Sequence, residues 1–399
     1  MPQAFEGIRI LDFTQVLAGP FAVMQLALLG AEVIKVEQPG GGDQTRELMN
    51  TGKHPGMSPA FMGMNLNKRS ITLDLKSVEA VTIIKKLIAS TDVLVENFRA
   101  GTMERMELGY EDLKKIKPDL IYCSVTGYGQ TGPKAGEAAY DGAIQASSGM
   151  MSQTGHPETG PTRTGFMPVD MATGLYTAFA ISASIHRKTR TGQGQKIDLA
   201  MMDSAIVVQA AQYNNYFNQG RLVGLLGNSS PTLQPTADVF PTKDGFIQVT
   251  ALNQSLVEKL FTSLGRKDDL QKAAFASTES RIENKAQVHE LINEALGTET
   301  TSHWMRHLSA AGIPVAEVRE LPEVANDSQF EHRRLFETIP SPLDSSDTVT
   351  LVKAGFITDK DGPQVRNRPP LLGEHTIEIL KSLSYSAEDI AAFKANGVT

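Results

Sequence analysis

Cysteine is nearly absent from this sequence of 399 residues, which has only Cys123. A single cysteine excludes an intrachain disulfide and a cysteine-rich zinc site. Long apolar runs are also missing, and the apolar stretch 21–29 is too short to cross a bilayer. The first residues lack the basic and apolar regions of a signal peptide. We therefore expect a cytoplasmic protein.

The sequence also has no block of like charges. It has 38 Lys and Arg against 45 Asp and Glu, a net charge of −7. A mildly acidic protein lacks the basic surface that nucleic acid or anionic lipid requires. We therefore expect neither as a partner, and any phosphate-bearing ligand must be held by a few local groups. With 41% hydrophobic and 21% charged residues, the composition is typical of globular proteins.

Strand and helix patterns alternate in the first third of the chain. Such alternation predicts an α/β fold with a parallel sheet covered on both faces. Ligands of these sheets bind beyond the carboxyl ends of the strands, so the segments after each strand are candidates for chemistry. The expected strands are 8–13, 32–37, 71–75, 92–96 and 120–125, and the expected helices are 21–29 and 78–89.

The rest of the chain has a different organisation. Residues 126–170 are rich in Gly, Ser and Thr and predict loops that face a ligand. A helix of small residues is expected at 171–185. Further elements are expected as a strand and a long helix within 193–219, strands at 245–250 and 351–357, and a closing helix after His375. The expected domains are 1–219 (large, N-terminal part), 220–320 (linker and small α/β domain) and 321–399 (return to the large domain).

A dinucleotide site is the first candidate for chemistry. Glu37 ends the second strand where a ribose-binding acid would lie. The loop after the first strand has one glycine, Gly19, where the fingerprint needs three, and Pro20 removes an N–H donor. These features disfavour a nicotinamide enzyme.

Metal and cysteine chemistry have weaker signals. Only His303 and His307 have i,i+4 spacing, without the Glu of an HExxH motif. This pattern favours a helix face, and no metal is expected. Cys123 lies in an apolar strand pattern and is expected in the core.

Asp170 leaves two alternatives open. It precedes a helix of small residues, where an aspartate commonly caps free N–H groups. A carboxylate among converging Gly, Ser and Thr segments could instead be a nucleophile.

Several motifs together closely resemble those of class III (CaiB/BaiF-type) CoA-transferases. They extend over essentially the whole chain and in the family's order. The matching segments are 11–20 (LDFTQVLAGP), 29–37 (LGAEVIKVE), 67–71 (NKRSI), 92–98 (DVLVENF), 127–133 (GYGQTGP), 140–141 (YD), 148–149 (SG), 170–174 (DMATG) and 369–376 (PPLLGEHT).

The resemblance implies a fold and an activity. The fold would be a Rossmann-like large domain built from both chain ends, with a smaller inserted α/β domain, in an interlocked homodimer. The activity would be transfer of CoA from a small acyl-CoA, succinyl-CoA by family habit, to a small carboxylic or dicarboxylic acid. Asp170 would be the nucleophile, through an aspartyl anhydride and an aspartyl-CoA thioester. The CoA thioester would be a substrate, with no tightly bound cofactor.

The resemblance also implies roles for individual residues. Tyr140 and Gln15 would join Asp170 in the catalytic site. The CoA contacts would come from Val16, Leu73, Lys76, Asn97, Phe98 and Arg105.

The sequence departs from the family pattern at two places. Gln38 stands where a basic residue is frequent, and the loop 227–231 has Ser230 in place of His. The second change points to an unusual acceptor. A second carboxylate of the acceptor could be bound by Arg46, Arg163 or Arg221.

Two other functions compete with the transferase. A 2-methylacyl-CoA racemase would carry a His-Asp pair where this chain has Tyr140 and Asp141. A CoA-binding protein without catalysis would not need the intact Asp170 motif.

Overall fold

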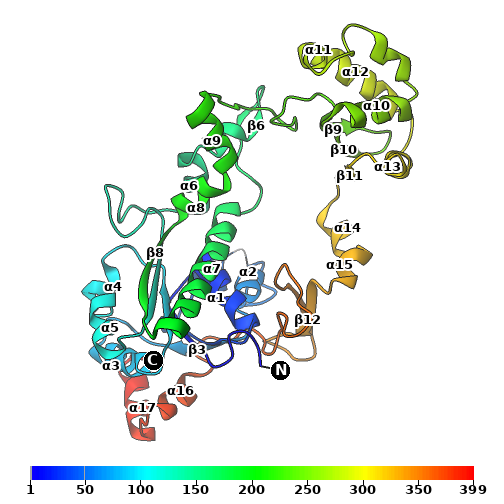
Figure 1. Ribbon diagram of the computed structural model, residues 1–399. Helices are drawn as coiled ribbons and strands as arrows, with labels where there is room; N and C mark the ends of the chain where they lie inside the picture. The colour runs from blue at the N-terminus through cyan, green and yellow to red at the C-terminus, as the bar shows by residue number, and fades with distance from the viewer. Residues whose placement is uncertain (1, 49) are drawn as a thin grey trace. The chain divides into compact units, whose positions relative to one another are not determined.

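The computed structural model describes residues 2–48 and 50–399 and divides into two compact units (Figure 1). The first unit holds Met1–Ser148, Thr164–Tyr213 and Ser328–Thr399, and the second holds Gly149–Arg163 and Asn214–Asp327. The domain boundaries expected from the sequence, after residues 219 and 320, stay a prediction.

The first unit is built on a six-stranded parallel sheet. This sheet confirms the expected α/β class. Along the sheet the strands are β3 (Lys68–Thr72), β2 (Glu32–Glu37), β1 (Arg9–Asp12), β4 (Val93–Glu96), β5 (Ile121–Thr126) and β8 (Gln195–Ala200).

Strand β3 begins three residues before the expected segment 71–75. The reason is Lys68, whose buried ammonium lies 2.8 Å from the Asp12 carboxylate. A lysine inside a buried strand has no apolar signature, so the sequence pattern missed the start of β3.

Helices cover both faces of this sheet (Figure 1). On one face, α1 (Ala18–Leu28) and α7 (Pro168–Thr191) pack through side chains such as Val23 and Ile181. The other face is covered by α3 (Val78–Ile88), α5 (Tyr110–Ile116), α16 (Thr376–Ser382) and α17 (Ala387–Ala395).

The strand order places a crevice between β1 and β4. The chain winds outward from β1 to β2 and β3 on one side, and from β4 to β5 and β8 on the other. Ligands of doubly wound sheets bind at this reversal, beyond the carboxyl ends of the strands. The residues after Asp12 and after Glu96 are therefore the ones placed for binding.

Shorter elements complete the first unit. A hairpin near the chain's end packs on α1 and α2 through Val349 and Leu351. The long helix expected after the strand near residue 195 is two helices, α8 and α9. The elements are η1 (Gln44–Arg46), α2 (Pro59–Met64), α4 (Thr102–Arg105), α6 (Asp141–Ser147), α8 (Met201–Val208), α15 (Ser328–His332), β12 (Phe336–Pro340) and β13 (Thr348–Val352). Helix α9 (Ala210–Gln219) begins in the first unit and ends in the second.

The second unit has its own core. A three-stranded antiparallel sheet packs against helices around buried residues such as Phe240 and Trp304. Its elements are η2 (Met151–Gln153), β6 (Gly155–His156), β7 (Gly160–Pro161), β9 (Ala237–Pro241), β10 (Phe246–Thr250), α10 (Gln254–Ser263), η3 (Lys267–Gln271), α11 (Thr278–Glu283), α12 (Lys285–Leu296), α13 (Thr301–Ala310), β11 (Val315–Glu317) and α14 (Leu321–Ala325). In neither unit is a described helix long and apolar enough to span a bilayer.

Candidate functional site

A cleft of about 390 Å³ lies in the first unit, beyond the carboxyl ends of β1, β4 and β5. This volume is in the range of small-molecule sites. The position is the one that the strand order predicts for a ligand. The lining comprises residues 15–18, Gln44, residues 97–100, 125–129 and 136–140, Asp170 and Met201.

Asp170 brings a buried carboxylate to this cleft. It is the third residue of α7 and only 8% exposed. Burial, together with the nearby negative charge of Asp141, raises its pKa to about 7. Among the described residues, no group donates a hydrogen bond to this carboxylate. It is therefore available to react.

Asp141 caps the helix that carries Asp170. The main-chain N–H groups of Val169 and Asp170 donate to Asp141 Oδ2 at 2.8 and 3.1 Å. Gln145 Nε2 donates to the other carboxylate oxygen at 2.5 Å. The capping interpretation of Asp170 is therefore wrong. Because α6 supplies the cap, the Asp170 side chain is left for another role.

Gly174 lets α7 approach the first turn of α1. A Cβ atom there would lie 2.8 Å from the carbonyl oxygen of Ala18 and 2.7 Å from Phe21 Cδ1. Residues four apart share a helix face, so Asp170 lies on the same face as this contact. The glycine thus brings Asp170 towards the segment that precedes α1.

The structure brings six of the nine predicted site residues together. Tyr140 precedes α6 and has a side chain that is 63% exposed. The six that line the cleft are Gln15, Val16, Asn97, Phe98, Tyr140 and Asp170.

The other three lie elsewhere in the first unit. Leu73 is 0% exposed in the core beneath α3, so any ligand contact at this position is left to its main chain. Lys76 and Arg105 are exposed. Arg105 Nη2 donates to Thr102 Oγ1 at 2.9 Å.

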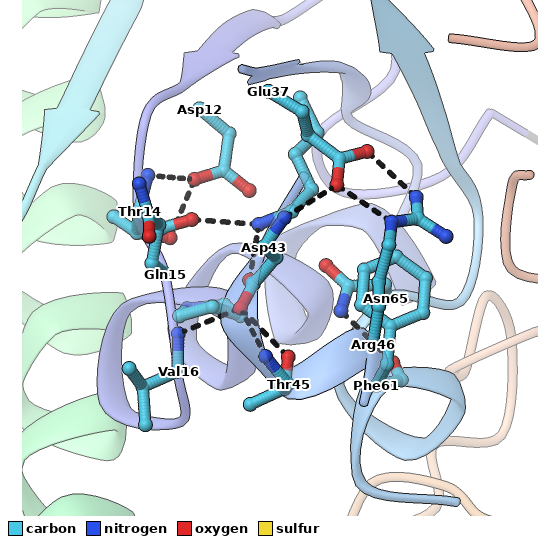
Figure 2. Close-up of polar contacts among 12 residues, drawn as sticks. Asp12, Thr14, Gln15, Val16, Glu37, Asp43, Thr45, Arg46, Phe61 and Asn65 are labelled. Carbon is cyan, nitrogen blue, oxygen red and sulfur yellow. Dashed lines mark hydrogen bonds and ion pairs between the residues drawn. The ribbon is translucent and has the colours of Figure 1, made fainter. Parts of the chain in front are cut away.

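A buried ionic cluster lies beside the cleft, and the patterns in the sequence do not reveal it (Figure 2). Its three ion pairs have side chains that are at most 3% exposed. Nζ of Lys35 lies 2.9 Å from Asp43 Oδ2, and the Asp43 and Glu37 carboxylates have lowered pKa values despite their burial, because they face these cations. The pairs are Lys35–Asp43, Lys68–Asp12 and Arg46–Glu37.

Arg46 is therefore not available to an acceptor. Its guanidinium donates to both oxygens of Glu37, at 2.7 and 2.8 Å. The expectation that Arg46 could bind a second carboxylate is wrong. Arg163 and Arg221 belong to the second unit, and their roles stay predictions.

The structure also places the residues that were considered for cysteine and metal chemistry. Cys123 is 0% exposed in β5, where burial raises the pKa of its thiol, so its assignment to the core is confirmed. His303 and His307 stack on α13 with ring centroids 5.9 Å apart. Within residues 2–48 and 50–399, no group of three or more His, Cys, Asp or Glu could hold a metal ion.

The sheet is doubly wound, and a buried carboxylate without a hydrogen-bond donor among the described residues lies at its crevice. This arrangement is typical of α/β enzymes that act on a ligand bound beyond the strand ends. The profile of CoA-transferase family III matches residues 5–376. The chain therefore belongs to CoA-transferase family III, and the expectation of a CoA-transferase is confirmed.

Individual relatives agree with this assignment. The chain is 36% identical to the succinyl-CoA:glutarate CoA-transferase of Mus musculus, over 98% of this chain and 89% of that protein. It is 35% identical to the succinate–glutarate CoA-transferase of Agrobacterium fabrum, over 95% of each chain. A crystal structure of a CaiB/BaiF family protein from Brucella suis matches with a TM-score of 0.85 at 32% identity, over 96% of this chain and 100% of that one.

Proposed function

We propose that the protein transfers CoA from succinyl-CoA to a small dicarboxylic acid, with Asp170 as the nucleophile. The observation that carries this proposal is the buried Asp170 carboxylate in the cleft, with its pKa raised to about 7. A desolvated carboxylate is more reactive than one in water. Relatives named for succinyl-CoA and glutarate support the choice of donor and acceptor class.

The reaction proceeds through two kinds of covalent intermediate. The Asp170 carboxylate attacks the donor thioester, which gives a mixed anhydride and free CoA thiolate. The thiolate attacks the aspartyl carbon of the anhydride, which gives an aspartyl-CoA thioester and releases succinate. The acceptor carboxylate then attacks this thioester and forms a second anhydride. The returning thiolate attacks the acceptor's acyl carbon, which completes the new thioester and restores Asp170.

Each attack forms a tetrahedral oxyanion that needs hydrogen-bond donors. The first turn of α1 supports this need, because Leu17 precedes the helix without a side-chain cap and both Leu17 and Ala18 line the cleft. The N–H groups of a helix's first turn have no partner within the helix. We assign them to the oxyanion, with the Gln15 and Tyr140 side chains beside the reacting acyl group.

Further residues serve the CoA molecule. Val16 and Phe98, which line the cleft, would contact the pantetheine arm. The exposed cations of Lys76 and Arg105 would hold phosphates nearer the surface. The main chain at Leu73 would contact the adenine. The loop 227–231 keeps its proposed role in acceptor choice.

The competing racemase would typically use a histidine paired with an aspartate as its acid and base. The described residues that line the cleft include no histidine. Nothing in the site favours this alternative.

A homodimer is part of the proposal. Large apolar side chains on α7 and α8 are exposed, including Leu175 at 56%, Phe179 at 71% and Val207 at 51%. Contiguous exposed apolar side chains are typical of association surfaces. A second copy of the chain, interlocked with the first in the cytoplasm, would cover them.

Mass spectrometry tests the proposed function. The protein is incubated with succinyl-CoA, or with acetyl-CoA, and with a panel of mono- and dicarboxylic acids. We expect a new CoA thioester with succinyl-CoA and one or more dicarboxylic acids. Hydrolysis of the donor without any new thioester would contradict transfer. Deuterium uptake at the α-carbon of a 2-methylacyl-CoA would indicate a racemase instead.

Burial raises the pKa of Asp170, and the negative charge of Asp141 raises it further. In Asp141→Asn the side-chain oxygen can still accept from the α7 N–H groups, but the negative charge that raises the pKa of Asp170 is gone. Only the ionised carboxylate attacks, so the wild-type rate falls as the pH drops through about 7. We expect this limb to move down by roughly half a unit to one unit in the variant. An unchanged pH profile of kcat would show that Asp141 acts only as a cap.

A further inference from the structure

The segment Thr14–Val16 follows β1 at the crevice and is held almost wholly by side chains (Figure 2). The ladder between β1 and β4 ends when Phe13 N–H donates to the carbonyl of Val95. Thr14 N–H then donates to Asp12 Oδ1 at 2.9 Å, and Thr14 C=O accepts from Lys35 Nζ at 2.6 Å. Val16 N–H donates to Asp43 Oδ1 at 3.2 Å.

Asn97 holds Gln15, the middle residue of this segment. Its Oδ1 accepts from Gln15 N–H at 2.9 Å, and its Nδ2 donates to Gln15 C=O at 2.8 Å. One carboxamide thus satisfies both main-chain groups of Gln15. Asn97 follows β4 and Gln15 follows β1, so this clamp links the segments that follow the two neighbouring parallel strands at which the strand order reverses.

The clamp fixes an unusual backbone conformation. Val16 has a φ angle of +70°, which a β-branched residue adopts only under constraint. Such conformations persist where the surroundings over-determine them, and they cluster at functional sites. Here the constraint fixes Gln15 and Val16, which line the same cleft as Asp170.

We propose that Asn97 is a positioning residue for CoA transfer, because its side-chain amide holds the Gln15–Val16 segment against the reacting thioester rather than binding CoA. This inference rests on the proposed function. It replaces the CoA contact that the family resemblance implies for the Asn97 side chain, since the two hydrogen bonds to Gln15 fix the orientation of this amide and give it a main-chain partner on each side.

The chain offers a matched control in Asn67. Its carboxamide also bridges main-chain groups, donating to Gln364 C=O at 2.7 Å and accepting from Arg366 N–H at 2.7 Å. It lies outside the cleft lining. Asn97→Ala and Asn67→Ala therefore remove the same kind of clamp, one at the site and one away from it.

The first experiment compares the two variants in steady-state transfer and in thermal unfolding. We expect Asn97→Ala to lower kcat about 10- to 100-fold, because a misplaced reacting group loses rate on this scale. The KM for succinyl-CoA should stay within about threefold. Asn67→Ala should keep the wild-type kcat whatever its loss in Tm. A raised KM with unchanged kcat in Asn97→Ala would instead assign Asn97 to CoA binding. Equal behaviour of the two variants would also overturn the proposal.

The variant Asn97→Asp should change the pH dependence of kcat, which a merely structural role of Asn97 would leave unchanged. A protonated carboxyl has one donor and one acceptor, as the amide does, whereas the carboxylate only accepts. The ratio of variant to wild-type kcat should therefore rise at least about tenfold as the pH falls from about 8 to about 5.5. A carboxylate at position 97 that raised the pKa of Asp170 would lower this ratio at low pH, so that effect cannot produce the expected rise. A ratio that does not depend on pH contradicts the clamp.

Amide hydrogen exchange tests the Asn97 clamp independently of the proposed CoA-transferase function. Exchange in the peptide that contains residues 14–17 should become at least about tenfold faster in Asn97→Ala and stay at the wild-type rate in Asn67→Ala. Unchanged exchange in Asn97→Ala overturns the clamp, whatever the enzyme does. A wild-type protein that transfers no CoA overturns the proposed function and with it the positioning role.

Discussion

Replacing Asp170 with alanine will abolish CoA transfer, with a loss of about 10⁴- to 10⁶-fold in kcat. The variant lacks the group that forms the anhydride and the aspartyl thioester, and the other carboxylate of the cleft lining, Glu137, is exposed to solvent and not desolvated as Asp170 is. Asp141, whose charge also acts on Asp170, is occupied by the N–H groups of α7. The measurement is the rate of new thioester formation, together with the mass of protein trapped with succinyl-CoA.

The control for this loss is Asp112→Ala. Asp112 is an acid on α5 that pairs with Lys115 at the surface, away from the cleft, and its removal should leave kcat unchanged. CoA binding should persist in Asp170→Ala, since the cleft is otherwise intact. A variant that still transfers CoA, or wild-type protein that never acquires the mass of a covalent adduct, would disprove nucleophilic attack by Asp170.

Asp170→Asn should also make the protein more stable at neutral and higher pH. Burial raises the pKa of Asp170 to about 7, so between its unfolded value near 4 and about 7 the unfolded chain releases a proton that the folded chain retains. The wild type therefore loses stability across this interval, and asparagine does not. The advantage of the variant should be absent near pH 4 and reach roughly 2–4 kcal/mol above pH 7. Urea unfolding at several pH values measures it.

The sequence predicts the central sheet well because that sheet follows from local patterns. Strands β4 and β5 are mostly apolar runs, as is typical of parallel strands buried on both faces. Strand β2 is indicated by Val33, Ile34 and Val36, although it also carries the buried Lys35. The start of β3 was missed because Lys68 is buried by an ion pair with a residue 56 positions away. The apolar pattern of a short segment does not indicate an ion-pair partner so distant in the sequence.

The residues of the candidate site also differ in how far the sequence alone could indicate them. Asp170 could be found because the motif 170–174 resembles that of the CoA-transferase family, whereas its residues alone left capping open. The clamp on Gln15 could not, because Asn97 lies 82 positions further along the chain. From sequence alone, Asn97 reads as a ligand contact and Arg46 as a free cation. Only the folded chain shows that each already has its partner.

Replacing Lys35 with methionine will destabilise the protein by about 3–5 kcal/mol, the usual cost of leaving a buried ion without its partner. The Lys35 ammonium is 0% exposed, lies 2.9 Å from Asp43 Oδ2 and donates to the carbonyl of Thr14 at 2.6 Å. Methionine has similar volume but no charge, so the Asp43 carboxylate loses its cation in an interior that solvates it poorly. The free energy of unfolding in urea measures the loss.

Two comparisons identify the buried charge as the cause. Arg9→Met removes one half of an exposed pair with Glu32, whose side chains are 56% and 61% exposed, and should cost less than about 1 kcal/mol.

In the wild type, Lys35 lowers the pKa of Asp43, so the pair stabilises the fold above the unfolded pKa of this carboxyl and loses that contribution as the pH falls through the folded value. Without Lys35 the pKa of Asp43 rises, and protonation relieves the unpaired charge. The deficit of Lys35→Met should therefore shrink as the pH is lowered from about 8 to about 5. A deficit that stays constant over this range would show that lost packing, and not lost charge, destabilises the variant.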